Sequence, residues 1–190
     1  KIIFRSETIL RRYQVLYCSN LILNGKSLEL GASENNKNFF TFVKGKSIFD
    51  LSNNFKNKKL NIFKADLTKK INIKSHTYNN ILIFNVLEHL PNYDNAISEI
   101  NRILKKGGSI IGSTPFIYQV HGAPKDYYRF SKDFFYYYLK KNKFRKIEIK
   151  CLGFGPFLAS YSLIHAYLRF LPIISHAILL ICYLSDFFIQ

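Results

Sequence analysis

Several residue types are scarce in this sequence, and each shortage narrows the range of protein classes. Its 190 residues include no methionine, no tryptophan and only three cysteines, Cys18, Cys151 and Cys182. An odd number of widely spaced cysteines provides neither a disulfide framework nor a zinc pattern. We therefore expect buried free thiols in a reducing cytoplasm, and no metal site. Since the chain begins at Lys1 and lacks methionine, we also expect a trimmed chain or a fragment.

Acidic residues are also few, with 12 against 28 basic residues and a formal net charge of +16. The last part of the chain, 152–190, contains only Arg169 and Asp186 as charged residues, so the positive excess lies before it. A basic body of this kind favours anionic partners: nucleic acid, an acidic membrane face or a phosphorylated substrate. A solvated lysine-rich surface without a partner is an equal alternative.

Apolar runs and turn signals divide the first 151 residues into alternating strands and helices. Strands are predicted at 26–30, 46–50, 60–66, 80–87, 109–114 and 145–151. Helices are predicted from Ser6 to about 22, from Asn92 to Lys106 with Gly107 as its end, and over 131–141. This order predicts an α/β, doubly wound, mostly parallel sheet whose ligand lies at the carboxyl ends of the strands. We expect one domain over 1–151, with 1–24 as a covering helix, and an apolar helical extension over 152–190.

The stretch "SLELGASENN" places Gly31 directly after the first strand, where a glycine leaves space for a sharp turn or a ligand. Asp50 ends the second strand nineteen residues later and is placed to accept hydrogen bonds from ribose hydroxyls. The loop lacks the second and third glycines of a dinucleotide site, and no GxxxxGK[ST] phosphate loop is present. A nucleoside cofactor without phosphates points to S-adenosylmethionine.

Further polar residues at strand ends support a cofactor of this kind. Glu29 is placed to help position the cationic methionine end, and Asp66 with Leu67 is placed to contact adenine. Each acid taken alone is more often a helix cap or a solvated group. The argument therefore rests on acids at three successive strand ends.

The stretch "NVLEHLPNYDNAISEINRILKKGGSIIGSTPF", Asn85 to Phe116, resembles the class I S-adenosylmethionine-dependent methyltransferases, in particular the methyltransferase type 11 group. The resemblance implies a Rossmann-like seven-stranded fold. It also implies a cofactor site formed by Glu29, Gly31, Asp50, Asp66 and Asn85. Ser33 and Asn35 stand where the family usually has glycines, and Ser33 is expected to face the ligand. The last, antiparallel strand of the family is not evident in this sequence.

The stretch "HGAPKDYYRF", His121 to Phe130, is similar to a segment of family members that act on sugars or surface glycans. It predicts His121 as a general base, with Asp126 orienting it or acting instead. Tyr127 and Arg129 are expected to bind substrate hydroxyls or a phosphate. The alternative is a rigid loop in which Asp126 and Arg129 form a structural pair and His121 is merely exposed. For Glu88 and His89, a structural role after the fourth strand is favoured.

The apolar extension is split by Pro172 into expected helices at 156–169 and 173–188. Each is shorter than the roughly 20 residues needed to cross a bilayer. A hairpin lying on an anionic membrane surface fits these lengths, with the basic body facing the headgroups. The alternatives are helices that pack on the sheet, form a lid or make a dimer contact.

Together these features predict an S-adenosylmethionine-dependent O-methyltransferase acting on a sugar, a surface glycan or a lipid-linked acceptor. A cytoplasmic protein, peripheral on the inner face of the membrane, is expected. An RNA-binding protein or RNA methyltransferase is one alternative, but the basic residues lack interleaved aromatic stacking residues, so nucleic acid is less favoured. A catalytically inactive module with a cofactor fold is the other alternative.

Overall fold

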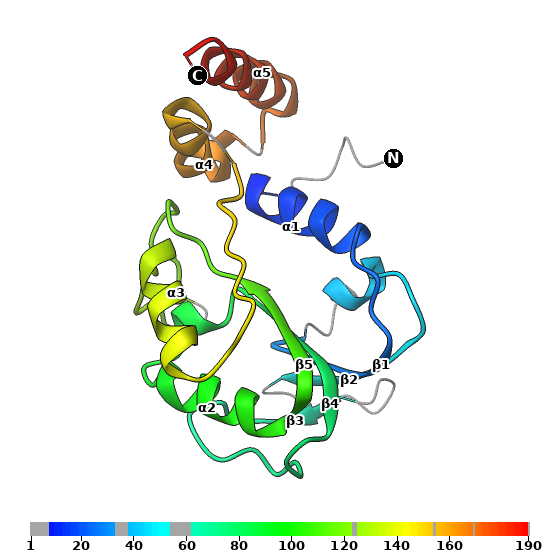
Figure 1. The fold of residues 1–190 in the computed structure, drawn as a ribbon. Coiled ribbons are helices and arrows are strands. Elements are labelled where there is room, and N and C mark those ends of the chain that lie inside the picture. Colours follow the sequence, from blue (N-terminus) through cyan, green and yellow to red (C-terminus); the bar gives the residue numbers. More distant parts are fainter. Residues whose placement is uncertain are drawn as a thin grey trace.

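A five-stranded parallel sheet forms the centre of the protein in a computed structural model (Figure 1) that describes residues 8–32, 38–53, 62–122, 125–153, 155–168 and 170–189. Its strand order is β3-β2-β1-β4-β5, and every neighbouring pair is parallel. The strands are β1 (Gly25–Leu30), β2 (Ser47–Asn53), β3 (Ile62–Lys64), β4 (Tyr78–Phe84) and β5 (Leu104–Ser113). The predicted doubly wound α/β fold is confirmed. Within the described ranges the sheet ends at β5, so it has five strands where the resemblance implied seven.

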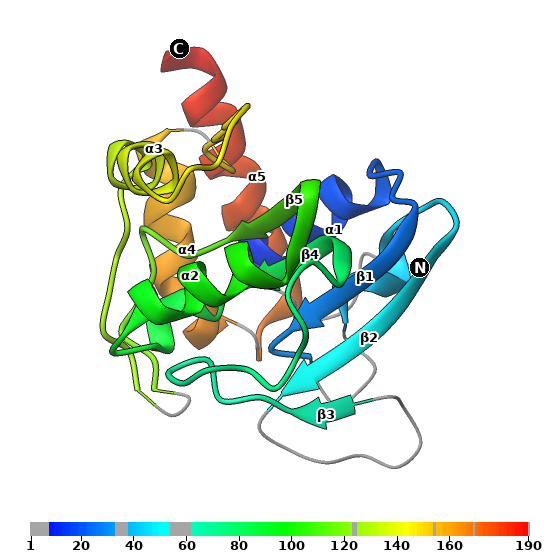
Figure 2. The same cartoon turned by 60° about the horizontal axis from the view of Figure 1, so that its bottom comes forward.

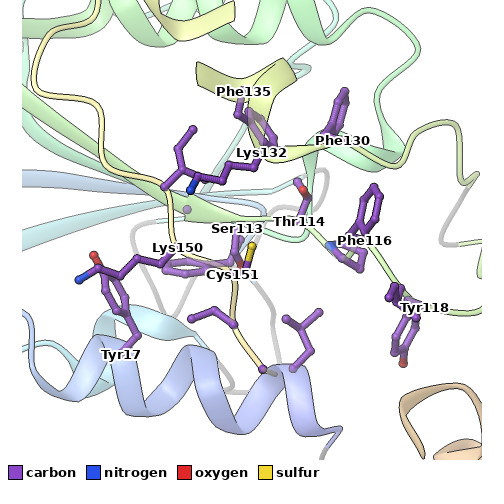
Figure 3. A pocket seen from close by; sticks show the side chains of 18 of the residues that line it. Tyr17, Ser113, Thr114, Phe116, Tyr118, Phe130, Lys132, Phe135, Lys150 and Cys151 are labelled. Carbon is purple, nitrogen blue, oxygen red and sulfur yellow. The ribbon is translucent and has the colours of Figure 1, made fainter. Parts of the chain in front are cut away.

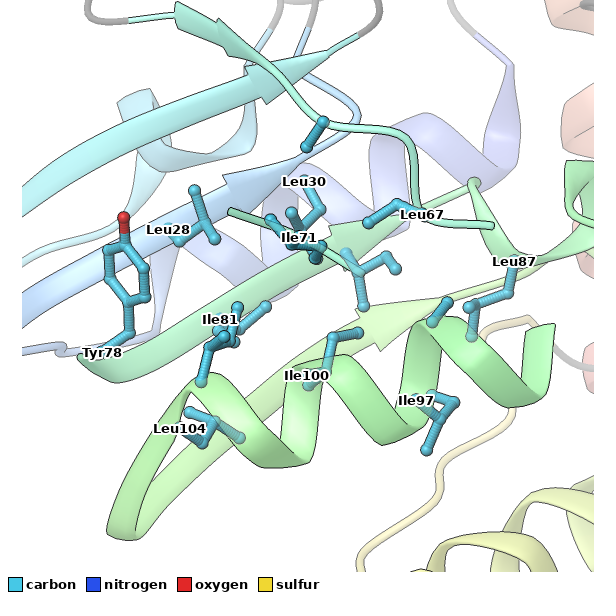
Figure 4. Close-up of a cluster of buried hydrophobic side chains, with 14 of the residues drawn as sticks. Leu28, Leu30, Leu67, Ile71, Tyr78, Ile81, Leu87, Ile97, Ile100 and Leu104 are labelled. Atoms are coloured by element: carbon cyan, nitrogen blue, oxygen red, sulfur yellow. The ribbon is translucent and has the colours of Figure 1, made fainter. Parts of the chain in front are cut away.

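One face of the sheet is covered by α2 (Tyr93–Ile103), with α3 (Lys132–Lys141) beside it. Apolar side chains at helical spacing on α2, among them Ile97 and Ile100, pack against Leu28 and Ile81 of the central strands (Figure 4). Asn92 caps α2, because its side chain accepts a hydrogen bond from the Asn95 amide. This burial of continuous apolar strands under a helix is what the sequence pattern predicted.

The opposite face is covered by α1 (Ile9–Ser19) and the short 3-10 helix η1 (Phe39–Phe42), so the sheet has helices on both sides (Figures 1 and 2). Cys18 of α1 is fully buried there, and burial raises the pKa of its thiol to about 12. The predicted covering helix is confirmed, although it begins after Thr8, whose hydroxyl accepts the Arg11 amide hydrogen bond, and not at Ser6. Of the cysteines expected to be buried, Cys151 is exposed.

The predicted helix over 92–106 is too long at its end. It stops at Ile103 because Leu104 has extended backbone angles and pairs with Tyr78, which starts β5 at once. The pairing is irregular between Tyr78 and Asn80, and Gly107, with a φ of 80°, lies in the facing part of β5. The two lysines that were expected to end the helix therefore lie in β5, in the irregular part of its pairing with β4.

The predicted strand at 145–151 is wrong. The segment is not part of any strand, although Ile147 and Ile149 alternate as a strand would require. It borders a cavity beside β5 and does not form a ladder with it. Alternation alone cannot supply the main-chain partner that a strand needs.

The apolar extension forms two helices, α4 (Pro156–Leu168) and α5 (Pro172–Ile189), which pack against each other beyond the end of α1 (Figure 1). Both were predicted. However, α5 has 18 residues, and by length and composition it is apolar enough to cross a membrane. The expectation that both helices are too short for this is therefore corrected for α5.

Candidate functional site

The carboxyl ends of β1 and β4 lie side by side, because Leu30 pairs with Ile83 in the parallel register. Gly31 follows β1 with a φ of 77°, a left-handed conformation that side chains disfavour. A Cβ atom at this position would lie 2.3 Å from Cγ2 of Val86, two residues beyond β4. Val86 thus occupies the space that the sequence analysis assigns to a ligand.

Asn85 has a positive φ of 54° at the end of β4 and makes a reciprocal pair with Gln14 of α1. Gln14 donates from Nε2 to Asn85 Oδ1 at 2.7 Å, and Asn85 donates from Nδ2 to Gln14 Oε1 at 3.2 Å. Gln14 Nε2 also donates to Ser113 Oγ, at the end of β5, at 2.7 Å. Gln14 is fully buried, so its side chain links α1 to the carboxyl ends of β4 and β5 and covers this part of the sheet edge. No sequence pattern pointed to Gln14.

Glu29 does not face an open site. Its side chain is buried and its two oxygens accept the main-chain amides of Phe39 at 2.9 Å and Phe40 at 2.8 Å. The pKa of Glu29 is raised because the effect of burial outweighs that of these hydrogen bonds, which lower it. The carboxylate holds the start of η1, so its predicted contact with a methionine group has no support from this geometry.

Asp50 was expected to end the second strand, but β2 continues to Asn53. In the register Asp50 lies opposite Leu28, whereas Ser52 lies opposite Leu30, the last residue of β1. The position level with the Gly31 turn is therefore Asn53. The side chain of Asp50 and the whole of Ser33 lie outside the described parts of the structure.

Asp66 and Leu67 follow β3 as predicted, but each has a local role. Asp66 Oδ1 accepts hydrogen bonds from the Thr68 amide and hydroxyl, which lower the pKa of this carboxyl group. Leu67 is buried in the core under α2. Asn95 of α2 donates to the carbonyl oxygens of Leu67 and Lys69 at 2.9 Å, so the turn is held firmly at the sheet edge.

The segment after β5 contains a compact ion pair. Both guanidinium NH groups of Arg129 donate to the two oxygens of Asp126, at 2.5 and 2.7 Å. This pairing keeps the pKa of Asp126 well below its usual range and raises that of Arg129. Arg129 also donates to the carbonyl of Gln119. The geometry is that of the structural pair, and Tyr127 lies beside it with an exposed side chain.

His121 is attached to this ion pair. Its amide donates to Asp126 Oδ2 at 3.0 Å, and its Nδ1 lies 3.3 Å from the same oxygen. Its ring is 5.0 Å from that of His89 in an edge-to-face arrangement. The structure therefore joins His121 and Asp126, as the sequence predicted, but it also brings them next to Glu88 and His89.

Glu88, for which the sequence favours a structural role, has the features of a functional residue in the structure. It lies in the 3-10 helix η2 (Leu87–His89), its side chain is fully buried, and within the described parts of the chain neither carboxylate oxygen has a hydrogen-bond partner. Burial raises the pKa of Glu88 to about 7. A buried carboxyl group with a pKa this high is typical of functional sites. Only the tertiary structure shows its position beside His121, because 33 positions separate them.

A cavity of about 660 Å³ lies next to this cluster, between α1, β5, α3, α4 and the segment 148–153 (Figure 3). Its lining is mostly apolar, with Ser113, Thr114 and Lys132 among its polar residues. Tyr118 lines it, and the Tyr118 ring is 5.0 Å from the ring of His121. The volume is in the range of small-molecule sites, which are mostly apolar with a few polar groups.

Comparison with known proteins gives the family context of this site. Residues 44–112 match the model of a methyltransferase domain, which spans the segment from β2 to β5. No curated protein matches the sequence. Many solved structures do match, and those named below are between 13% and 15% identical to this chain.

One similar structure is a Haloferax volcanii protein in complex with the Trm112 methyltransferase activator, with 13% identity, 70% of this chain and 68% of that chain covered, and a TM-score of 0.54. A Bacillus halodurans protein described as a methyltransferase has 14% identity, coverages of 68% and 66%, and a TM-score of 0.51. The cyclase SpnF has 15% identity, coverages of 70% and 56%, and a TM-score of 0.53. This chain thus spans about two thirds of the first two.

Proposed function

We propose that this chain, which has the class I methyltransferase fold and matches a methyltransferase domain over residues 44–112, methylates a hydroxyl group of a sugar, a surface glycan or a lipid-linked acceptor. The domain match supports a methyltransferase that uses S-adenosylmethionine. The single observation that carries the proposal is that this match covers β2, β3 and β4, the last of which ends just before Asn85, beside the Gly31 turn. The identity of the acceptor is a separate part of the proposal and rests on the cavity.

We place the cofactor at this edge, beside Gly31, Asp66, Leu67 and Asn85, with Ser33 and Asp50 as predicted contributors. In open α/β sheets a ligand binds beyond the carboxyl ends of the strands. Binding then requires that Val86 move from its contact with Gly31. Positioning of the cofactor methyl group next to the acceptor oxygen supplies most of the rate increase, and His121 or its neighbours receive the acceptor proton.

Calorimetric titration with S-adenosylmethionine tests the cofactor site. We expect binding by the wild type and an affinity at least about ten-fold lower for Asp50→Ala, because a ribose contact of this kind is worth about 1.5 kcal/mol or more. Asn53→Ala tests the position that the register places next to Gly31. Asp133→Ala, in the first turn of α3, is the control and should bind like wild type. Wild-type protein that does not bind, or Asp50 and Asn53 variants that both bind normally, would contradict this cofactor site.

The cavity supports an acceptor with a large apolar part. It lies between the sheet and α4, and it is lined by apolar side chains such as Ile111, Phe116 and Leu158 (Figure 3). A lipid-linked sugar presents such an apolar part together with hydroxyl groups. The cavity also touches the ion-pair loop through Tyr118, so that a hydroxyl group at its edge would lie near His121.

The distribution of polarity in the apolar extension supports contact with a membrane. Its buried residues include polar ones, His165, Ser175 and Asp186, whereas large apolar side chains point outward, with Ile173 85% and Phe188 81% exposed. This distribution, with polar residues buried and apolar residues exposed, is the reverse of that in a water-soluble protein. Contiguous exposed apolar side chains mark an interaction site. We propose that residues 152–190 form a membrane-associated extension of the domain at 1–151, and that the basic body faces anionic headgroups.

Sedimentation with lipid vesicles tests this contact. We expect the wild type to bind anionic vesicles, and the double variant Ile181→Glu/Phe188→Glu to bind at least about ten-fold less, since each charge must leave water. Both side chains are exposed, so the fold should survive. Tyr137→Glu, which changes an exposed aromatic side chain on α3, outside the apolar extension, is the control. Equal binding by all three proteins, or none by the wild type, would remove the membrane from the proposal.

An inactive module with a cofactor fold remains the second candidate, and one observation favours it. Val86 fills the space at Gly31 that a cofactor would approach. The cyclase SpnF also has this fold, so the fold by itself does not fix the reaction. The calorimetric titration separates the two candidates, because a module without a cofactor site gives no binding heat with the wild type.

A further inference from the structure

Three possible metal ligands meet where η2 contacts the loop after β5. One ligand atom each from Glu88, His89 and His121 lies within 4.8 Å of the others. Oε1 of Glu88 is 3.8 Å from Nε2 of His89. Around a zinc ion, tetrahedral ligands are separated by roughly 3.4 Å, given bonds of about 2.1 Å. Small side-chain shifts are therefore enough to bring the three atoms onto one cation.

The carboxylate of Glu88 provides the second, independent observation. It is fully buried, and both oxygens lack a hydrogen-bond partner among the residues that the structure describes. Buried polar groups in folded proteins nearly always have partners, and an exception needs an explanation such as a missing ion. Replacing Glu88 by a hydrophobic residue of similar size would remove this cost, yet the sequence has an acid here. A cation bound between Glu88 and the two histidines gives this buried carboxylate the partner that it lacks among the described residues.

The hydrogen bonds of the histidines prepare them as ligands. Nδ1 of His89 lies 2.6 Å from the carbonyl oxygen of Lys125, so it carries the proton and donates it. Nε2 of His89 then has a free lone pair and is the atom that faces Glu88. Nδ1 of His121 lies near Asp126 Oδ2 and the Gln119 carbonyl, which fixes the same tautomer. Histidines that bind metals usually donate their other N–H to a carbonyl or a carboxylate in this way.

The loop that carries these partners is itself fixed. The amides of Tyr127 and Tyr128 donate to the main-chain oxygen of Glu88, at 2.8 and 3.3 Å. Arg129 holds Asp126 through two hydrogen bonds, so this carboxylate accepts from His121 in a set position. Asp126, which the sequence analysis expects to orient His121, is thus held in place by Arg129.

We propose that Glu88, His89 and His121 bind one divalent transition-metal cation, with zinc and manganese as the best candidates. Two imidazoles and one carboxylate match the ligand preferences of these ions, and three protein ligands leave a position open. The side chain of His121 is 30% exposed, so the site is accessible to solvent, and the ring of His121 lies 5.0 Å from that of Tyr118, which lines the cavity. On the basis of the proposed function, the open position on the cation is where the acceptor hydroxyl oxygen would bind, and His121 would then hold the cation instead of receiving the acceptor proton.

Metal binding can be measured directly on the full chain after treatment with a chelator. Titration with zinc or manganese chloride should give one tight site per chain, confirmed by elemental analysis after dialysis. We expect Glu88→Gln and His121→Ala each to lower the affinity by at least about 100-fold. Two control variants should keep the site: His76→Ala, whose ring binds the carbonyl of Leu104, and the exposed Glu148→Gln.

Thermal unfolding with and without metal keeps the test valid if a variant folds poorly. Metal should raise the melting temperature of the wild type and of both controls, and leave that of Glu88→Gln unchanged. Binding that is equally tight in Glu88→Gln, or no site in the wild type, would overturn the proposal. S-adenosylmethionine titration in the presence of chelator is independent of this result, so failure of the metal site and failure of the methyltransferase proposal can be told apart.

Discussion

Replacing Gly112 by alanine is expected to lower the free energy of unfolding by about 3 kcal/mol or more. Gly112 lies near the end of β5, which is an edge strand of the described sheet, and it is opposite Ile83 of β4. A Cβ atom there would lie 2.0 Å from the main-chain oxygen of Ile83. A main-chain atom in a ladder cannot rotate away as a side chain can, so the two strands must separate locally. Urea unfolding followed by circular dichroism measures the effect.

Gly107→Ala is the matched control for this substitution. It lies in the same strand and has a φ of 80°, but no atom lies within 4 Å of the added Cβ. Only the left-handed conformation then opposes the substitution, at about 1 to 2 kcal/mol. If both variants lose the same amount, the clash with Ile83 is not the cause.

Replacing Asp186 by alanine is expected to destabilise the apolar extension by about 3 kcal/mol. Asp186 of α5 is fully buried, and its oxygens accept the amides of Phe157 at 3.0 Å and Leu158 at 2.7 Å, in the first turn of α4. These amides have no partner within their own helix. The carboxylate therefore caps α4 from its neighbouring helix, and its loss leaves two buried donors unsatisfied.

Hydrogen exchange of the first-turn amides of α4 checks this prediction. Their protection should fall by roughly 100-fold in Asp186→Ala, since 3 kcal/mol corresponds to about that factor. Ser160→Ala, which removes an exposed hydroxyl that donates to Pro156, is the control and should leave protection unchanged. Unchanged protection in Asp186→Ala would mean that α4 is held mainly by apolar contacts.

The sequence predicted the fold class and most of the elements because their signals are local. The continuous apolar run of β4 and the helical spacing of Ile97, Ile100 and Ile103 indicate burial without any knowledge of neighbours. The break at Pro172 separates α4 and α5 for an equally local reason, since proline starts α5. The wrong predictions occur where the secondary structure of a residue depends on a strand that is distant in the sequence. Leu104, predicted to be helical, is an example, because it pairs with Tyr78 of β4.

The candidate site was less predictable, because a side chain's role depends on distant main-chain groups. The sequence predicts Glu29 as a cofactor ligand, but both of its oxygens accept hydrogen bonds from main-chain amides about ten residues later. Gly31 appeared to make room for a ligand, and the structure gives that room to Val86. The sequence favours a structural role for Glu88. The structure instead shows that its carboxylate lies near His121 and has no hydrogen-bond partner among the described residues.

The edge position of β5 has a consequence for the size of the cavity. Among the described strands β5 has a neighbour on one side only, so its outer main-chain groups are not used in a ladder. The segment 148–153 borders the cavity directly opposite, without joining the sheet. The space beside β5 can hold either a sixth strand or a bound small molecule, but not both. The cavity therefore exists because the segment 148–153 does not pair with β5.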